Sequence, residues 1–290
     1  MNYKEQYSAY LNQVESYLLA TLNNLSVSAP STIKSAMNYA VLDGGKRVRP
    51  VLCLAVADIL QLPFDRLKEF AVAIELVHSY SLVHDDLPAM DNDDFRRGKP
   101  STHKKFGEAN AILAGDALLN YAFELCLSKE NFNALDAKAL KLFAEYAGYD
   151  GMIAGQILDL ESQGKSGNSD LLYQIYFNKT AKLIMCPILI ASILKDGQYY
   201  KELYDFGYNL GVMFQIIDDI MDVEGTLQSI GKTPNKDLLE DKLTSIKLFG
   251  LDGAKQLAKK HYDNCLHALK NIPNNEFLLE LTQSMFDRRK

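Results

Sequence analysis

The sequence contains no tryptophan and only four cysteines among its 290 residues. The cysteines are far apart and form no CxxC pair, which excludes both a zinc-ribbon pattern and the dense disulfide framework of small secreted domains. We therefore predict that they are buried small hydrophobic residues in a reducing compartment. They are Cys53, Cys126, Cys186 and Cys265.

A long apolar run is also missing. The longest extends from Leu183 to Leu194 and contains Pro187, whereas a membrane helix needs roughly 20 apolar residues. This segment is predicted to be a core helix that bends at the proline. The first residues are polar and contain no secretory apolar segment. We expect a cytoplasmic protein without a membrane span.

Positive charge is in deficit. The net charge is -6 and the pI is about 5.4, and no broad basic stripe is present, which argues against a nucleic-acid partner. A hydrophobic content of 48% with 23% charged residues is typical of a globular protein with a sizeable core. The basic residues gather in small clusters near acidic motifs, a pattern that suits a charged small molecule.

Apolar residues recur at three- and four-residue spacing along most of the chain, which predicts helices. Without a biased linker or a repeat, the sequence favours one all-α domain over residues 1–290. We expect a layered bundle of about ten to twelve helices around a central cavity. Ser31 and Ser169 are predicted N-caps. Residues 287–290 could close over a substrate site or form a solvated terminus, and the second is the favoured prediction. The predicted helices are Tyr10–Leu22, Ile33–Leu42, Val51–Leu60, Leu67–Val83, Ala109–Leu127, Leu135–Ala147, Leu171–Leu194, Tyr199–Val223, Thr244–Phe249, Ala254–Leu269 and Glu276–Arg288.

Two aspartate-rich clusters, Asp85–Asp91 and Asp218–Asp222, each follow an apolar helical run. Carboxylates crowded beside buried surface repel one another and lose hydration unless cations neutralise them. Oxygen ligands favour Mg²⁺, which usually keeps waters and shares its coordination with substrate phosphates. One such cluster could equally be a solvated helix end. Two together predict that a diphosphate is held between carboxylate-bound magnesium sites.

The two clusters differ in geometry. Asp218 and Asp222 are four residues apart, so they lie on one face of a helix. Asp85 and Asp91 would be separated by roughly 240° on a straight helix. Their convergence on one ion needs a break in the helix, for which Pro88 provides a local reason.

Basic residues complete the pattern. Arginine suits bidentate contacts with phosphate oxygens, and lysine suits neutralisation by a point charge. Each basic pair alone is more readily explained as ordinary surface charge, but their occurrence together with the acidic clusters favours a diphosphate site. The residues are Lys46, Arg49, Arg96, Arg97, Lys179, Lys232 and Lys242.

These motifs occur together in an order that resembles the trans-isoprenyl diphosphate synthases, and among them the bacterial farnesyl diphosphate synthases. The resemblance runs from about Ala36 to Leu251. One departure is that this chain has Lys242-Leu-Thr-Ser245 where the family often has Lys-x-Thr-Tyr, which leaves the contact around Ser245 open. The matching segments are Gly44–Pro50, His78–Asp91, Arg96–Pro100, Gly155–Leu160, Lys179-Thr180, Phe214–Asp222 and Gly231-Lys232.

The resemblance implies an enzyme of isoprenoid biosynthesis that joins isopentenyl diphosphate head-to-tail to dimethylallyl or geranyl diphosphate. The reaction would proceed by ionisation, condensation and elimination, and the released diphosphate would take the proton. The resemblance also implies three Mg²⁺ ions per site, with Mn²⁺ as a substitute, and a homodimer.

The resemblance assigns each site residue a role. Asp85, Asp86, Asp91, Asp218 and Asp222 would bind metal, with Asp219 in support. The allylic diphosphate would be bound by Arg96, Lys179, Lys232 and Lys242. Isopentenyl diphosphate would be bound by Lys46, Arg49, His78 and Arg97. The carbocation would lie near the Lys179 carbonyl, Thr180 and Gln215. From the residue alone, His78 on an apolar helix is more often a satisfied core residue.

Tyr80 precedes Asp85 by five residues, about 7.5 Å along a helix. The resemblance implies that this aromatic floors the allylic pocket and limits the product to fifteen carbons, although the residue alone could be a core aromatic. A geranylgeranyl or longer-chain synthase is the main alternative. A terpene cyclase is a second alternative, but a cyclase would not need the isopentenyl site and tends to line its cavity with tryptophan, which this chain lacks. A non-catalytic subunit is a third alternative, but such subunits tend to lose one acidic motif, and this chain has both.

Overall fold

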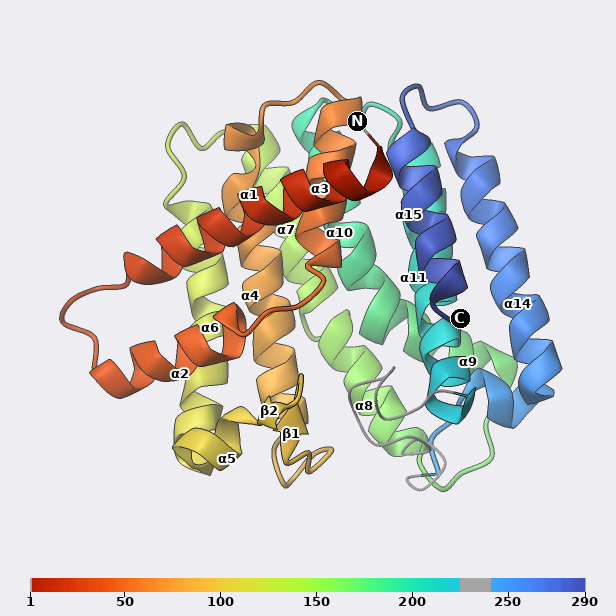
Figure 1. The fold of residues 1–290 in the computed structure, drawn as a ribbon, viewed down its shortest axis with the longest axis horizontal. Coiled ribbons are helices and arrows are strands. Elements are labelled where there is room, and N and C mark those ends of the chain that lie inside the picture. Colours follow the sequence, from red (N-terminus) through yellow and green to blue (C-terminus); the bar gives the residue numbers. More distant parts are fainter. Residues whose placement is uncertain (1, 225–240, 290) are drawn as a thin grey trace. The chain divides into compact units, whose positions relative to one another are not determined.

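The computed structural model describes residues 2–224 and 241–289, and these are almost entirely helical (Figure 1). This confirms the predicted all-α class. The elements are α1 (Tyr3–Asn23), α2 (Ser31–Leu42), α3 (Val48–Ile59), α4 (Lys68–Asp85), the strands β1 (Phe95–Arg96) and β2 (Lys99–Pro100), α5 (Thr102–Phe106), α6 (Glu108–Leu127), α7 (Ala134–Ala147), α8 (Met152–Ser162), α9 (Ser169–Ile175), the π-helix Tyr176–Ala181, α10 (Lys182–Leu194), α11 (Tyr200–Glu224), α14 (Ser245–Leu269) and α15 (Glu276–Phe286), with 3₁₀-helices at Phe64–Arg66 and Asp287–Arg289.

The contacts divide the chain into two compact units. The first unit comprises Met1–Leu54 and Pro63–Ala134, and the second comprises Ala55–Leu62 and Leu135–Lys290. Each unit has helices whose apolar faces are buried. The expectation of a single domain over residues 1–290 stays a prediction.

In the first unit, α4 packs along α6, and α1 and α2 pack against α4 (Figure 1). The close approach of α4 and α6 requires a glycine, because a side chain on Gly115 would overlap the ring of His84. A nitrogen of that ring lies 3.0 Å from the carbonyl oxygen of Ile112 on α6. The β1–β2 hairpin follows α4 and pairs Phe95 with Pro100.

Arg47, in the loop before α3, ties the first unit together. Its guanidinium donates to Glu15 on α1 at 2.7 Å, to Glu75 on α4 at 2.9 Å and to the carbonyl oxygen of Val41 on α2 at 2.6 Å. Arg47 and Glu75 are each 2% exposed. Burial opposes the arginine charge, but the two glutamates outweigh it and raise the pKa of Arg47. A buried arginine thus fixes the loop that leads into α3.

In the second unit, α11 is the central helix, and α10, α14 and the π-helix pack against it. The continuous helical stretch Ser169–Leu194 is long and apolar enough to span a membrane, by length and composition alone. However, 72% of its most apolar window is buried inside the fold, as expected of a core helix. The irregular turn of this stretch is the π-helix, which precedes Pro187.

Two predicted N-caps are wrong by one residue. Pro30 occupies the cap position of α2 without a side-chain hydrogen bond, so Ser31 is already helical. At α9 the cap is Asn168, whose side-chain oxygen accepts from the Leu171 N–H at 2.9 Å, and Ser169 again lies inside the helix. In both places the preceding residue holds the chain outside the helix, by the proline ring or by the asparagine oxygen.

The sequence pattern also missed α8. Gly155 lowers the helical propensity of that segment, but it is needed there, since a side chain at this position would overlap the backbone of Lys179 in the π-helix. The break predicted between Thr244–Phe249 and Ala254–Leu269 is confirmed, because Gly250 in α14 has a non-helical φ of 68°.

Glu75→Ala is expected to destabilise the protein by about 3–5 kcal/mol, because it leaves the buried Arg47 charge with only one carboxylate partner. Urea unfolding measures this change. The exposed pair Lys141–Glu145 provides the control, and Glu145→Ala should cost less than about 1 kcal/mol. Equal losses in the two variants would show that the Arg47 pair does not anchor the fold.

Candidate functional site

The first aspartate cluster sits where α4 ends. The helix stops at Asp85, and the following loop folds back so that the Asp91 N–H donates to the Asp85 carbonyl oxygen at 2.8 Å. The Asp93 N–H donates to the Asp86 carbonyl oxygen at 3.1 Å in the same way. The predicted break between Asp85 and Asp91 is therefore confirmed, and it places these two half-buried residues side by side.

Asp86 differs from its neighbours, because its side chain is only 3% exposed. Its two carboxylate oxygens accept hydrogen bonds from Arg96 Nε at 3.1 and 3.2 Å, and Arg96 Nη2 also donates to it. Burial raises the pKa of Asp86, and the arginine partly opposes that rise. Two residues for which different roles were predicted, metal binding and diphosphate binding, are thus bonded to each other.

A glycine loop brings Arg97 to the start of α3. Gly44 and Gly45 have φ values of 83° and 134°, which L-residues rarely adopt. The Arg97 guanidinium donates to the Gly44 carbonyl oxygen. A side-chain carbon on Gly45 would lie 3.1 Å from the guanidinium carbon of Arg97. The loop therefore needs glycine for its conformation, and a side chain at Gly45 would have to displace the Arg97 guanidinium.

Four arginines influence the protonation of His78, a half-buried residue of α4. Burial lowers the pKa of His78 well below 6.5, and the positive charges of Arg49, Arg97, Arg96 and Arg47 lower it further. The imidazole is therefore neutral, in a region of concentrated positive charge. This positive charge would stabilise a bound anion. The diphosphate group of isopentenyl diphosphate is the anion predicted to bind here.

The second aspartate cluster lies on α11. Asp218 is 36% exposed at its side chain, whereas Asp219 and Asp222 are 3% and 1% exposed. Arg288 Nη1 lies 3.4 Å from Asp218 Oδ1, and its guanidinium stacks 5.1 Å from the ring centre of Phe214. The prediction that the C-terminal segment is simply solvated is therefore wrong for Arg288.

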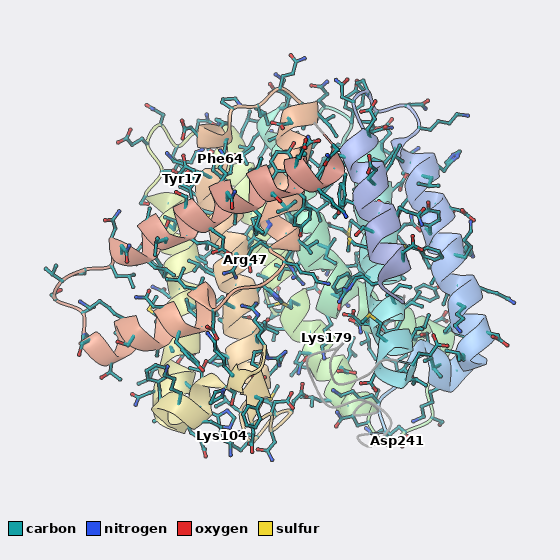
Figure 2. The ribbon with its side chains drawn as sticks, in the orientation of Figure 1. Tyr17, Arg47, Phe64, Lys104, Lys179 and Asp241 are labelled. Carbon is teal, nitrogen blue, oxygen red and sulfur yellow. The ribbon has the colours of Figure 1, made fainter. Side chains whose placement is uncertain are left out.

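The π-helix assembles the residues predicted to face a carbocation. Lys179 Nζ lies 2.6 Å from Asp159 Oδ2 (Lys179 is labelled in Figure 2). The Thr180 hydroxyl donates to Gln215 Oε1 at 2.6 Å. The wide turn fits because glycine occurs on an adjacent helix: a side chain on Gly211 would overlap Ala181. Asp159 lies within a motif that resembled the family, but spacing alone did not assign it a role.

Two further lysines were predicted to bind diphosphate. Lys242 is half-buried and lies three residues before α14 begins. Lys232 lies outside the described residues.

Tyr80 on α4 is 6% exposed, and burial raises its pKa to about 12, with a smaller contribution from Asp85. Its ring meets that of His84 edge-on at 5.7 Å.

The donor set around Asp85 suits magnesium. Within residues 2–224 and 241–289, no three histidine, cysteine, aspartate or glutamate side chains are placed to hold one ion. Asp85 and Asp91 nevertheless form a pair of half-buried carboxylates. A pair of carboxylates is what Mg²⁺ commonly takes from a protein when water and substrate phosphate complete its octahedron.

The four cysteines are free and buried, as expected. Burial raises the pKa of Cys53 to about 12, so this thiol stays protonated at neutral pH and is a poor nucleophile. Neither the site in the first unit nor that in the second uses a cysteine.

Comparison with known proteins places these features in context. A sequence model of the polyprenyl synthetase family matches residues 30–278. Farnesyl diphosphate synthase of Micrococcus luteus is 41% identical over 285 residues, which cover 97% of this chain and 96% of the relative. Geranylgeranyl pyrophosphate synthase 7 of Arabidopsis thaliana is 42% identical over 242 residues, which cover 81% and 70%. The crystal structure of a Helicobacter pylori geranyltransferase complexed with magnesium and isoprenyl diphosphate superposes with a TM-score of 0.81 at 32% identity, covering 97% and 96%.

His78 should make the protein less stable in acid. The pKa of His78 lies below its unfolded value of about 6.5, so the unfolded state binds the extra proton first as the pH falls. The stability contributed by the neutral ring is complete above about pH 6.5 and is lost below it. Urea unfolding at about pH 7.5 and pH 5.5 should show a smaller loss for His78→Asn than for the unsubstituted protein. Burial lowers the pKa of His261 to about 4. This residue therefore adds to the loss of stability in both proteins. Equal losses would contradict the prediction.

Proposed function

The chain belongs to the polyprenyl synthetase family, and on that premise we propose that it is a prenyltransferase that makes farnesyl diphosphate. It joins isopentenyl diphosphate to dimethylallyl or geranyl diphosphate and releases diphosphate. One observation carries the proposal: the first unit contains two different sites that can each take a diphosphate, one through carboxylate-bound Mg²⁺ and one by direct contact with positive charge. These are the carboxylate pair Asp85 and Asp91 and the arginine cluster around neutral His78. Two sites suit two diphosphate substrates, whereas a cyclase needs one.

The arginine cluster is the proposed site for isopentenyl diphosphate. Lys46, Arg49 and Arg97 supply positive charge, and the glycine loop holds Arg97 in place. The neutral ring of His78 adds a hydrogen-bonding group without further charge. Arg47 is excluded from this role because Glu15, Glu75 and Val41 occupy its guanidinium.

The carboxylates are the proposed magnesium ligands. Asp85 and Asp91 provide oxygens in the first unit, and Asp218 and Asp222 provide oxygens in the second. When bound, Mg²⁺ supplies charge that stabilises the departing diphosphate. We propose three ions, with Mn²⁺ as a substitute. Asp86 remains hydrogen-bonded to Arg96 and is proposed to hold that arginine in position. The residues proposed to contact the allylic diphosphate are Arg96, Lys179, Lys232 and Lys242.

Oxygen atoms of the second unit are proposed to stabilise the allylic cation. The hydroxyl of Thr180 and the side-chain oxygen of Gln215 lie 2.6 Å apart, and the carbonyl oxygen of Lys179 belongs to the same π-helix. Neutral oxygens stabilise positive charge by their dipoles without trapping the cation as a covalent adduct. The proton lost in the last step goes to the released diphosphate.

We also propose that the protein is a cytoplasmic homodimer. Helix α6 exposes large apolar side chains: Ile112 is 44%, Leu113 57% and Leu127 60% exposed. Exposed large apolar side chains are often buried in a subunit interface.

A longer-chain synthase is the second candidate, because a geranylgeranyl pyrophosphate synthase also matches at 42% identity. The large side chain of Tyr80, close in sequence to Asp85, favours the shorter product. The coverage of the farnesyl diphosphate synthase relative, nearly the full length of both chains, favours the same choice.

The direct test is product length. Purified protein with Mg²⁺, labelled isopentenyl diphosphate and geranyl diphosphate should yield farnesyl diphosphate as the main product on reverse-phase chromatography. A twenty-carbon product would favour the second candidate. No incorporation of isopentenyl diphosphate would contradict the prenyltransferase assignment.

Tyr80→Ala is expected to lengthen the product beyond fifteen carbons, because it removes the ring proposed to close the pocket. Tyr80→Phe is the matched control and should still give farnesyl diphosphate, since it keeps the ring. An unchanged product from Tyr80→Ala would show that another residue sets the chain length.

A further inference from the structure

Asp219 occupies an unusual position within the second aspartate cluster. Its carboxylate oxygen Oδ2 accepts hydrogen bonds from the Ser245 N–H at 2.8 Å, from the Ser245 hydroxyl at 2.8 Å and from the Tyr176 hydroxyl. Its other oxygen accepts from Gln215 Nε2 at 3.3 Å. Tyr176 and Ser245 are 3% and 0% exposed. The structure thus buries this carboxylate among four donors from three elements.

An ionised carboxylate offers about four lone-pair sites. At Asp219 three donors converge on Oδ2, which has no capacity left for an ion, and one of them, the Ser245 N–H, also donates to the Tyr176 hydroxyl oxygen at 2.7 Å. Oδ1 has one donor at 3.3 Å, but the residue is only 3% exposed, which limits the access of a hydrated ion. The adjacent Asp218 is 36% exposed, and its oxygens face a more open environment. The two aspartates of the pair are therefore suited to different tasks.

The donors come from segments that matter for the proposed reaction. Tyr176 opens the π-helix that carries Lys179 and Thr180. Ser245 opens α14, and Lys242 lies three residues before it. Asp219 is therefore the point where α11, the π-helix and the start of α14 are joined.

The segment around Lys242 is anchored on both sides. The carbonyl oxygen of Asp241, labelled in Figure 2, accepts from the Gly164 N–H at 3.1 Å. Leu243 is 2% exposed and fills the space that a side chain on Gly167 would need. With Ser245 held by Asp219, the backbone on either side of Lys242 is fixed.

We propose that Asp219, clamped by Tyr176 and Ser245, is a positioning residue that holds Lys242 for the diphosphate and does not itself bind metal. This inference rests on the proposed function, because it concerns the same diphosphate. It also accounts for the departure from the family motif. Position 245, where a tyrosine is frequent in the family, is a serine here, and both its hydroxyl and the phenol of Tyr176 donate to the Asp219 carboxylate.

The first cluster shows the same arrangement independently. Asp86, the second aspartate of its pair, is 2% exposed, and its oxygens accept hydrogen bonds from Arg96. In each cluster the second aspartate is buried and holds a basic residue or the segment that carries one. In each, the first aspartate stays more open to solvent.

Substitution of the donors tests the proposal without removing a charge near the metal ligands. Isothermal titration with inorganic diphosphate in the presence of Mg²⁺ should show that Ser245→Ala and Tyr176→Phe each bind about tenfold more weakly, the effect of one lost hydrogen bond. The KM for geranyl diphosphate should rise by a similar factor. Ser245→Thr should restore binding. Tyr173→Phe is the control, because the Tyr173 hydroxyl lies 3.3 Å from His261 Nε2 and does not contact Asp219.

The decisive comparison uses a Lys242→Ala background. If Ser245 acts through Lys242, Ser245→Ala should cause no further weakening there. An equal tenfold loss in that background, or unchanged binding by Ser245→Ala alone, would overturn the proposal. Thermal unfolding of each variant ensures that binding is compared between folded proteins. The binding titration does not depend on turnover, so its failure is distinguishable from a failure of the proposed function, which would appear as an absence of product from the unsubstituted protein.

Discussion

The structure depends on the pairing of carboxylates that are buried within or directly after apolar helices. An ionised carboxylate loses several kcal/mol of hydration on burial unless donors replace the lost water. Glu75 accepts a hydrogen bond from Arg47, and Asp86 accepts hydrogen bonds from Arg96. Asp219 accepts hydrogen bonds from Tyr176 and Ser245. Each pairing joins two different segments of the chain, so the buried charges also determine which loops lie beside which helices.

These pairings separate the acidic residues into two groups within each unit. The buried carboxylates of Glu75, Asp86 and Asp219 have protein donors and therefore fix the backbone, whereas Asp85, Asp91 and Asp218 remain more exposed. Both groups suit a metal-dependent site, because hydrogen-bonded residues around the ligands orient the ligands for the ion. The same logic applies to basic residues, since Arg47 is consumed by the fold while Arg49 and Arg97 add positive charge around His78.

Helical periodicity located most of the helices because burial of one apolar face repeats every three to four residues. It could not find the π-helix Tyr176–Ala181 or predict α8, since both depend on contacts with other helices through Gly155 and Gly211. The N-caps at Pro30 and Asn168 were missed by one residue because neighbouring residues compete for the same position. The prediction of a solvated terminus is wrong for Arg288, because this residue contacts Asp218. The two residues are far apart in the chain, so no local pattern indicates the contact.

The all-α class, the two acidic clusters and the break between Asp85 and Asp91 can be predicted from the amino-acid sequence, because these follow from local spacing and from the chemistry of single residue types. Which aspartate of each pair is buried, and which basic residue is already hydrogen-bonded to a carboxylate, is set by the folded structure. Those outcomes depend on donors from elsewhere in the chain, such as Arg96 for Asp86 and Ser245 for Asp219. No local pattern contains that information, because hydrogen-bond partners are chosen by folding and not by sequence distance.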